Sequence, residues 1–215
     1  MTITYNPKAG RYVGSDGKFV SKAVVDNLLD QEQARAEVRL KGLTRLLIEQ
    51  QIDLAEWQSR TAQTIKEANV RELTLAAGGK DRLTSRHYGA AGYQLQQQYK
   101  YLDNFARQLY AGNVTEKQAI RRSGLYAQSV RITFSRSEQL SREAEGFTEA
   151  KRSLDPQAQH CNSCLKHSTN GRWVLASRVT PAGLNCECGQ WCRCRVSYRR
   201  RPANSLNQSG ILSTT

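Results

Sequence analysis

The sequence contains no long apolar run. Its uninterrupted apolar stretches, such as Leu46–Ile48, are only a few residues long, whereas a helix that spans a bilayer needs roughly 18–20 such residues. The first ten residues also lack the apolar segment of a signal peptide. We therefore expect a chain without membrane contact that is made and kept in the cytosol, where disulfides are rare.

Catalytic motifs are also missing. The chain has three histidines, and it contains no His-Glu-x-x-His, no Gly-x-Ser-x-Gly and no glycine-rich phosphate loop before a helix. His87, which stands beside Tyr88, is more typical of a polar helix face than of a catalytic base. The sequence therefore favours a protein that is not an enzyme.

Acidic residues are scarce relative to basic ones, with 19 Asp and Glu against 32 Lys and Arg and a net charge of +13. From Lys151 onward there are ten basic and two acidic residues, which gives +8 for that part alone. A basic surface attracts polyanions such as nucleic acid or an acidic protein, although such charge can also serve solubility alone. The candidate nucleic-acid contacts are Arg193, Arg195, Arg199, Arg200 and Arg201.

Proline is absent between Pro7 and Pro156, and apolar residues in that interval recur at helical spacing. Hydrophobic residues make up 39% of the chain, a composition that favours extended helices with solvated faces over a large compact core. The predicted helices begin after Ser21, near Leu43, near Ser85 and after Thr115, and end at Gly78–Gly79, at Gly112–Asn113 and near Gly146.

Short β-like runs appear only after Pro156, at Arg172–Leu175 and Arg195–Tyr198. The predicted fold class is therefore mainly α, with an elongated helical body and a small cysteine-rich module that is α+β or irregular. The predicted parts are a flexible N-terminal arm (1–20) that is ordered only on a partner, a helical body (21–150), a cysteine-rich module (151–200) and a tail (201–215).

All six cysteines lie between Cys161 and Cys194. Cys161-x-x-Cys164 has the spacing that holds half of a tetrahedral zinc site, and a later pair would complete it. The later candidates are Cys186, Cys188, Cys192 and Cys194, and His160 and His167 are also able to ligate.

Three states of these cysteines remain open. A structural zinc ion is favoured by the cytosolic expectation, disulfides would form in an oxidising medium outside the cell, and free or redox-active thiols are the third possibility. A catalytic zinc ion is not expected, because such sites keep an open position and usually use histidine or carboxylate ligands.

An ordered set of motifs resembles a known family. The first part of the set lies in the helical region and contains Trp57-Gln58, the stop at Gly78-Gly79, Gln98–Leu102 with Phe105, Gly112, and Arg122-Ser123 with Tyr126. The second part follows it and contains Phe147–Arg152, Asp155, the Cys161/Cys164 pair, Gly171, Pro181 and Cys192-Arg193-Cys194. This order is similar to that of the Mu-F-like phage head morphogenesis proteins, also called minor head proteins, over about residues 40–200. The chain departs from that family where Cys186 and Cys188 occupy an interval that commonly holds a histidine.

The resemblance implies a structural or assembly protein of a phage virion, near the portal or on the inner capsid and assembled in the host cytoplasm. It implies portal or capsid proteins as partners, a few copies together in each particle, and contact with packaged DNA as a possibility. It also implies Cys161, Cys164, Cys192 and Cys194 as the first metal ligands. The alternative is a zinc-stabilised nucleic-acid-binding protein with Trp173, Trp191 and Tyr198 between its basic residues, although core filling is the preferred explanation of such aromatics.

Overall fold

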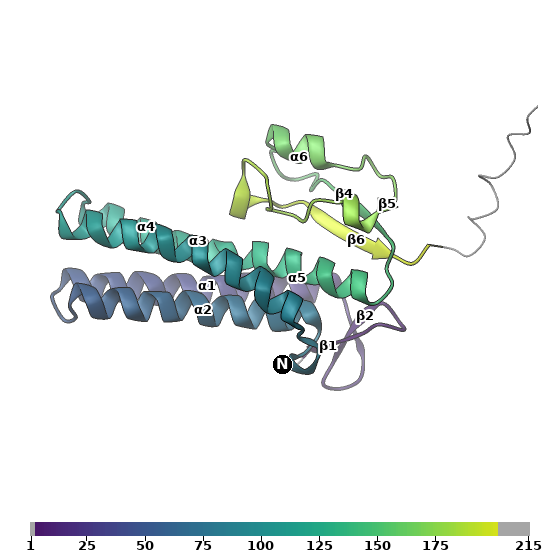
Figure 1. Ribbon diagram of the computed structural model, residues 1–215, viewed down its shortest axis with the longest axis horizontal. Helices are drawn as coiled ribbons and strands as arrows, with labels where there is room; N and C mark the ends of the chain where they lie inside the picture. Colours follow the sequence, from purple (N-terminus) through teal and green to yellow (C-terminus); the bar gives the residue numbers. More distant parts are fainter. Residues whose placement is uncertain (1–2, 202–215) are drawn as a thin grey trace, which may run out of the picture.

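The computed structural model describes residues 3–201. It confirms a mainly α protein with a cysteine-rich C-terminal module (Figure 1). Long helices lie side by side in an elongated bundle: α1 (Lys22–Ile48), α2 (Leu54–Ala77), α3 (Ser85–Tyr110), α4 (Glu116–Leu125) and α5 (Val130–Ala144). Among residues 3–201, none of the helices has both the length and the hydropathy required to cross a bilayer.

Capping residues set the ends of the first two helices. The Ser21 side chain caps α1 as predicted, and Asp53 caps α2 by accepting from the Glu56 backbone N–H at 2.7 Å. The prediction of a helix that starts near Leu43 is wrong, because that segment continues α1 as far as Ile48. Apolar residues on both sides of the turn preserve the helical pattern in the sequence and hide the break.

Further caps position the second half of the bundle. Gly78 ends α2 in the left-handed conformation, with φ of 82°, and α3 has the predicted bounds of Ser85 and Tyr110. Thr115 and Gln118 form a capping box at the start of α4. The predicted single fourth helix is interrupted by the 3-10 helix η2 (Tyr126–Ser129) before α5 begins, whereas the predicted break at Gly146 is confirmed.

The bundle core is centred on Trp57, which has no exposed surface. Its ring lies edge-on to Phe105 with centroids 5.5 Å apart, and its indole N–H donates to the Thr44 hydroxyl at 3.1 Å. Both polar and apolar parts of this large side chain are therefore satisfied inside the bundle.

The prediction of a flexible arm over residues 1–20 is wrong for the described part, where β1 (Ile3–Asn6), β2 (Arg11–Gly14) and β3 (Phe19–Val20) form an antiparallel sheet. Tyr5 and Tyr12 face each other across this sheet and are buried. The fully buried Arg142 of α5 donates to the Tyr12 hydroxyl at 3.0 Å and pairs with Glu145 at 3.2 Å. The sheet thus packs on the chain's own helices.

The C-terminal module lies on one side of the bundle (Figure 1). Its sheet has the order β5-β4-β6, with both pairs antiparallel. The smaller elements are β4 (Glu149–Ser153), α6 (Asn162–His167), β5 (Val174–Leu175), β6 (Arg195–Arg199) and the 3-10 helices η1 (Lys80–Arg82), η3 (Ala176–Arg178) and η4 (Gly189–Trp191). Apart from Arg201, the predicted tail over 201–215 lies outside the described residues.

One side chain of the bundle joins the module directly. The buried Gln139 amide of α5 donates to the backbone carbonyls of Ala176 and Val179 at 3.1 and 3.0 Å. These two residues and Ala150 are the buried apolar residues of the module's own small core cluster. So small a core contributes little apolar burial, and other interactions must hold the module together.

Candidate metal centre

Short elements bring the cysteines together. Cys161 caps the N-terminus of α6, its sulfur accepts from the Cys164 backbone N–H at 3.4 Å, and Cys164 lies within the first turn of that helix. Gly183 allows its own loop to pack closely against Gly189 and against α5. A Cβ at this position would lie 3.0 Å from the Gly189 carbonyl oxygen and 3.0 Å from the Ile132 side chain.

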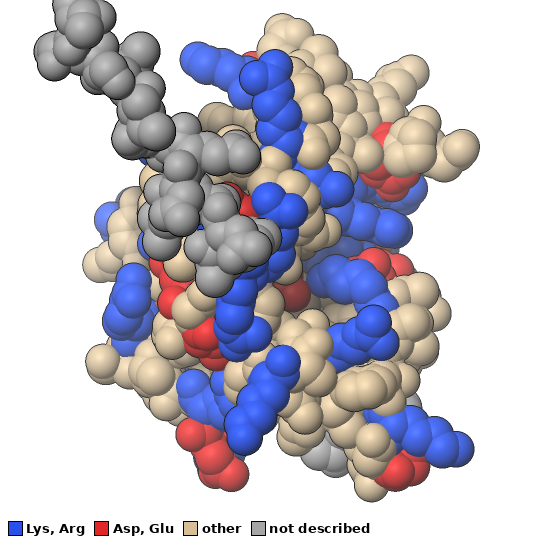
Figure 2. Space-filling model, turned by 90° about the vertical axis from the view of Figure 1, so that its right-hand side faces the viewer, with Lys and Arg blue, Asp and Glu red and all other residues tan. Residues whose placement is uncertain are grey.

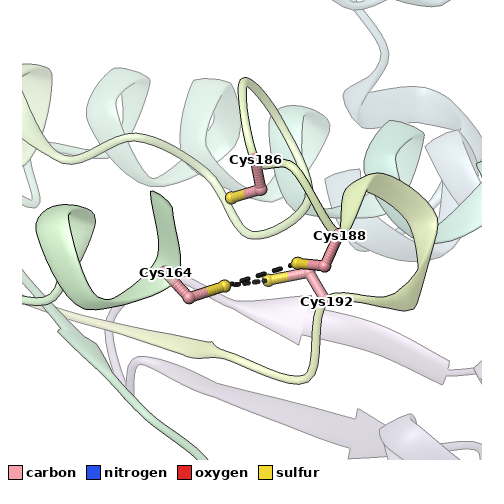
Figure 3. Close-up of side chains that lie close together, drawn as sticks. All are labelled: Cys164, Cys186, Cys188 and Cys192. Atoms are coloured by element: carbon pink, nitrogen blue, oxygen red, sulfur yellow. Dashed lines mark hydrogen bonds between the residues drawn. The ribbon is translucent and has the colours of Figure 1, made fainter. Parts of the chain in front are cut away.

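Cys164, Cys186, Cys188 and Cys192 form a four-sulfur group in which all sulfur atoms lie within 4.8 Å of one another (Figure 3). The Cys164 sulfur is 3.4 Å from that of Cys188 and 3.6 Å from that of Cys192. Four sulfurs at about 2.3 Å from one zinc ion would be separated by about 3.8 Å. The group could therefore hold a metal ion with little rearrangement.

The six cysteines are free thiols in the structure. A disulfide needs a sulfur–sulfur distance of about 2.05 Å, much shorter than the 3.4 Å between Cys164 and Cys188. Burial raises the pKa of the Cys164 thiol and raises that of Cys188 to about 12. Binding of a metal ion to these thiols would release their protons.

Arg152 of β4 contacts the four-sulfur group and has no exposed surface. One terminal nitrogen of its guanidinium lies 3.0 Å from the Cys186 sulfur, 3.5 Å from that of Cys192 and 3.8 Å from that of Cys164. Its other terminal nitrogen donates to the Thr180 carbonyl oxygen at 2.9 Å. Within residues 3–201 no ion pair joins this guanidinium to a carboxylate, and its partners are sulfur atoms and backbone carbonyl oxygens.

The structure brings two of the four first-choice ligands into the four-sulfur group, Cys164 and Cys192. Cys194 instead forms a second group with His160 and Cys164, whose donor atoms also lie within 4.8 Å of one another. Cys161 caps α6 beside them, and His167 belongs to neither group. Cys186 and Cys188, which the spacing offered as alternatives, complete the four-sulfur group.

The predicted nucleic-acid contacts are Arg193, Arg195, Arg199, Arg200 and Arg201. Arg195 pairs with Asp26 at 3.9 Å and Arg199 with Glu149 at 2.7 Å, while Arg200 donates to two backbone carbonyl oxygens. On the face drawn in Figure 2, blue Lys and Arg side chains are widespread, and red Asp and Glu side chains lie among them. Much of the positive charge of this run is thus engaged within the chain.

Comparison of the chain with protein-family models, with curated proteins and with solved structures gave no match. The resemblance to the Mu-F-like family therefore rests on the motif residues alone. Sequence reasoning missed Arg152 as part of the site. The only available signal was its place in the Phe147–Arg152 motif just ahead of the cysteines.

Proposed function

We propose that this protein is a non-catalytic structural protein of a bacteriophage head whose C-terminal module is held together by a structural zinc ion. The motif order that resembles minor head proteins supports the role in the particle. The long helical bundle with a small side module offers extended surfaces for portal or capsid proteins. In this role several copies enter each virion during assembly in the host cytoplasm.

The contact between Arg152 and the cysteines is the observation that carries the zinc site. A fully buried guanidinium needs a negative counter-charge, and leaving it unpaired is strongly destabilising. Its neighbours are sulfur atoms at 3.0–3.8 Å, and they supply that charge only as thiolates. Several thiolates this close repel one another unless a cation lies between them, and zinc is the usual ion for four tetrahedral thiolates.

The energetics agree with a structural role for the metal. Zinc binding contributes about 10–16 kcal/mol of apparent free energy in zinc-finger peptides, which is large beside a core cluster of Ala150, Ala176 and Val179. Four cysteine ligands also leave no open coordination position for a substrate. The site therefore suits folding of the module better than catalysis.

Metal analysis tests the site. The purified chain should contain at least one zinc ion for each molecule, and a chelator should release it as the thiols become reactive. A folded chain that contains no metal and has six reactive thiols would contradict the zinc site.

Particle analysis tests the role. Mass spectrometry of purified particles should find the chain at a constant ratio to the capsid protein, and Cys164→Ser should lower its incorporation. Leu165→Ser is the matched control, because the Leu165 side chain is the next in α6 and is 53% exposed. Absence of the chain from particles, together with salt-dependent binding of the isolated chain to DNA, would favour the nucleic-acid-binding alternative.

A further inference from the structure

Four candidate ligands lie outside the four-sulfur group: His160, Cys161, His167 and Cys194. Two of them, His160 and Cys194, share the neighbour Cys164 with it. The donor atoms of His160 and Cys194 lie within 4.8 Å of each other and of the Cys164 sulfur. Cys164 thus belongs to both groups, and it is 1% exposed at the centre of the cluster. A thiolate sulfur carries several lone pairs, so one cysteine can bind two metal ions at once.

The His160 ring is oriented as a metal ligand would be. Its Nε2 atom lies 2.8 Å from the backbone carbonyl oxygen of Asp155. A carbonyl oxygen only accepts hydrogen bonds, so Nε2 carries the proton and Nδ1 keeps a free lone pair. Histidines that bind metals usually donate their other ring N–H to a carbonyl or carboxylate in this way.

Cys161 provides one more donor beside the shared cysteine. Its sulfur accepts the Cys164 backbone N–H at 3.4 Å, a contact that stabilises a thiolate. Two four-coordinate ions that share one sulfur need seven donor atoms. The six cysteines and His160, whose donor atom lies beside those of Cys164 and Cys194, supply seven.

We propose that Cys164 bridges two zinc ions in a binuclear cluster. The first ion is bound by the four-sulfur group, and the second by Cys164, Cys194, His160 and Cys161. This inference rests on the proposed zinc site and extends it. Each cysteine ligand gives up its proton as the metal binds, and no redox step is involved.

Native mass spectrometry of the full chain loaded with zinc(II) tests the cluster. The wild-type chain should retain two zinc ions and His160→Ala one. His167→Ala is the matched control and should retain two, because the His167 ring lies 3.2 Å from the Asn185 carbonyl oxygen but belongs to neither group. X-ray absorption of the wild-type zinc protein should show a second zinc atom near the first, a result that needs no variant to fold.

The outcomes separate the two proposals. A wild-type chain with one zinc ion and no zinc neighbour overturns the binuclear cluster but leaves the single structural site intact. A folded chain without zinc overturns both. Two ions retained equally in His160→Ala and His167→Ala would overturn the assignment of His160 as a ligand.

Discussion

Replacement of Arg152 by methionine should weaken zinc binding by about 10–100-fold, the usual effect of removing a partner of a metal ligand, or about 1.4–2.8 kcal/mol. The guanidinium lies within 3.0–3.8 Å of three ligand sulfurs. Methionine has a similar length but neither the charge nor the donors that offset thiolate charge. Competition with a chromophoric chelator at fixed pH measures the change in affinity.

The chain provides a matched control in Arg142, which is 2% exposed and also pairs within the chain, but with Tyr12 and Glu145 rather than with sulfur. Arg142→Met should lower the free energy of unfolding while zinc affinity stays at the wild-type value. Arg152→Lys keeps the charge but loses the forked geometry, so its zinc affinity should lie between those of the wild type and Arg152→Met. Equal zinc affinity in both methionine variants would refute charge compensation by Arg152.

Three further measurements probe the rest of the fold. Burial lowers the pKa of His87. The contribution of His87 to the free energy of unfolding should therefore be complete above its unfolded pKa of about 6.5 and should fall as the pH drops through that value. His87→Gln should flatten this dependence of stability on pH, measured in urea melts. A Cβ on Gly78 would lie 2.3 Å from the Cβ of Tyr5, so Gly78→Ala should cost more than the about 1–2 kcal/mol of left-handed strain alone. Gly112→Ala, at φ of 68° with nothing within 4 Å, should cost only that strain, and equal denaturation midpoints for the two glycine variants would contradict the contact. Chelation should expose the amides of the C-terminal sheet to hydrogen exchange while those of α2 and α3 stay protected, and simultaneous loss of protection in all of them would show that the module and the bundle unfold together.

The helices were largely predictable because their ends have local chemical signals. Ser21 and Thr115 cap helices through their own side chains, and Gly78 adopts a positive φ that ends α2. The break between α1 and α2 was not predictable from periodicity, since it depends on Gln50, a non-glycine residue at φ of 57°. A conformation that is unfavourable for this residue type leaves no mark in the hydrophobic pattern.

The N-terminal sheet was missed because distant contacts stabilise it. Its strands contain four, four and two residues, too few for a clear alternating pattern. Tyr5 and Tyr12 pack instead against Phe147 and Arg142, more than a hundred residues further along the chain. Sequence reasoning that works through local periods has no access to such partners.

Cysteine spacing predicted a metal site but left its ligands open. Cys186-x-Cys188 and Cys192-x-Cys194 both place two sulfurs two residues apart, so spacing alone does not tell which pair binds the metal ion together with Cys164. The path of the loop decides, because it brings Cys186, Cys188 and Cys192 to Cys164 and leaves Cys194 beside His160. That path follows from contacts such as those of Gly183 with Gly189 and Ile132.

The central strand of the module and its cysteines depend on each other. In β4 the buried positions are Ala150 and Arg152, and the other three are half-buried, so the strand has almost no apolar signature and escaped prediction. A strand with an inward arginine is stable only when a counter-charge lies beneath it. In the proposed zinc site thiolates supply that charge, and they in turn need the cation to remain ionised so close together. Loss of the metal would therefore remove the ligand bonds and also leave a buried positive charge at the centre of the sheet, which is why strand and site should form and unfold as one unit.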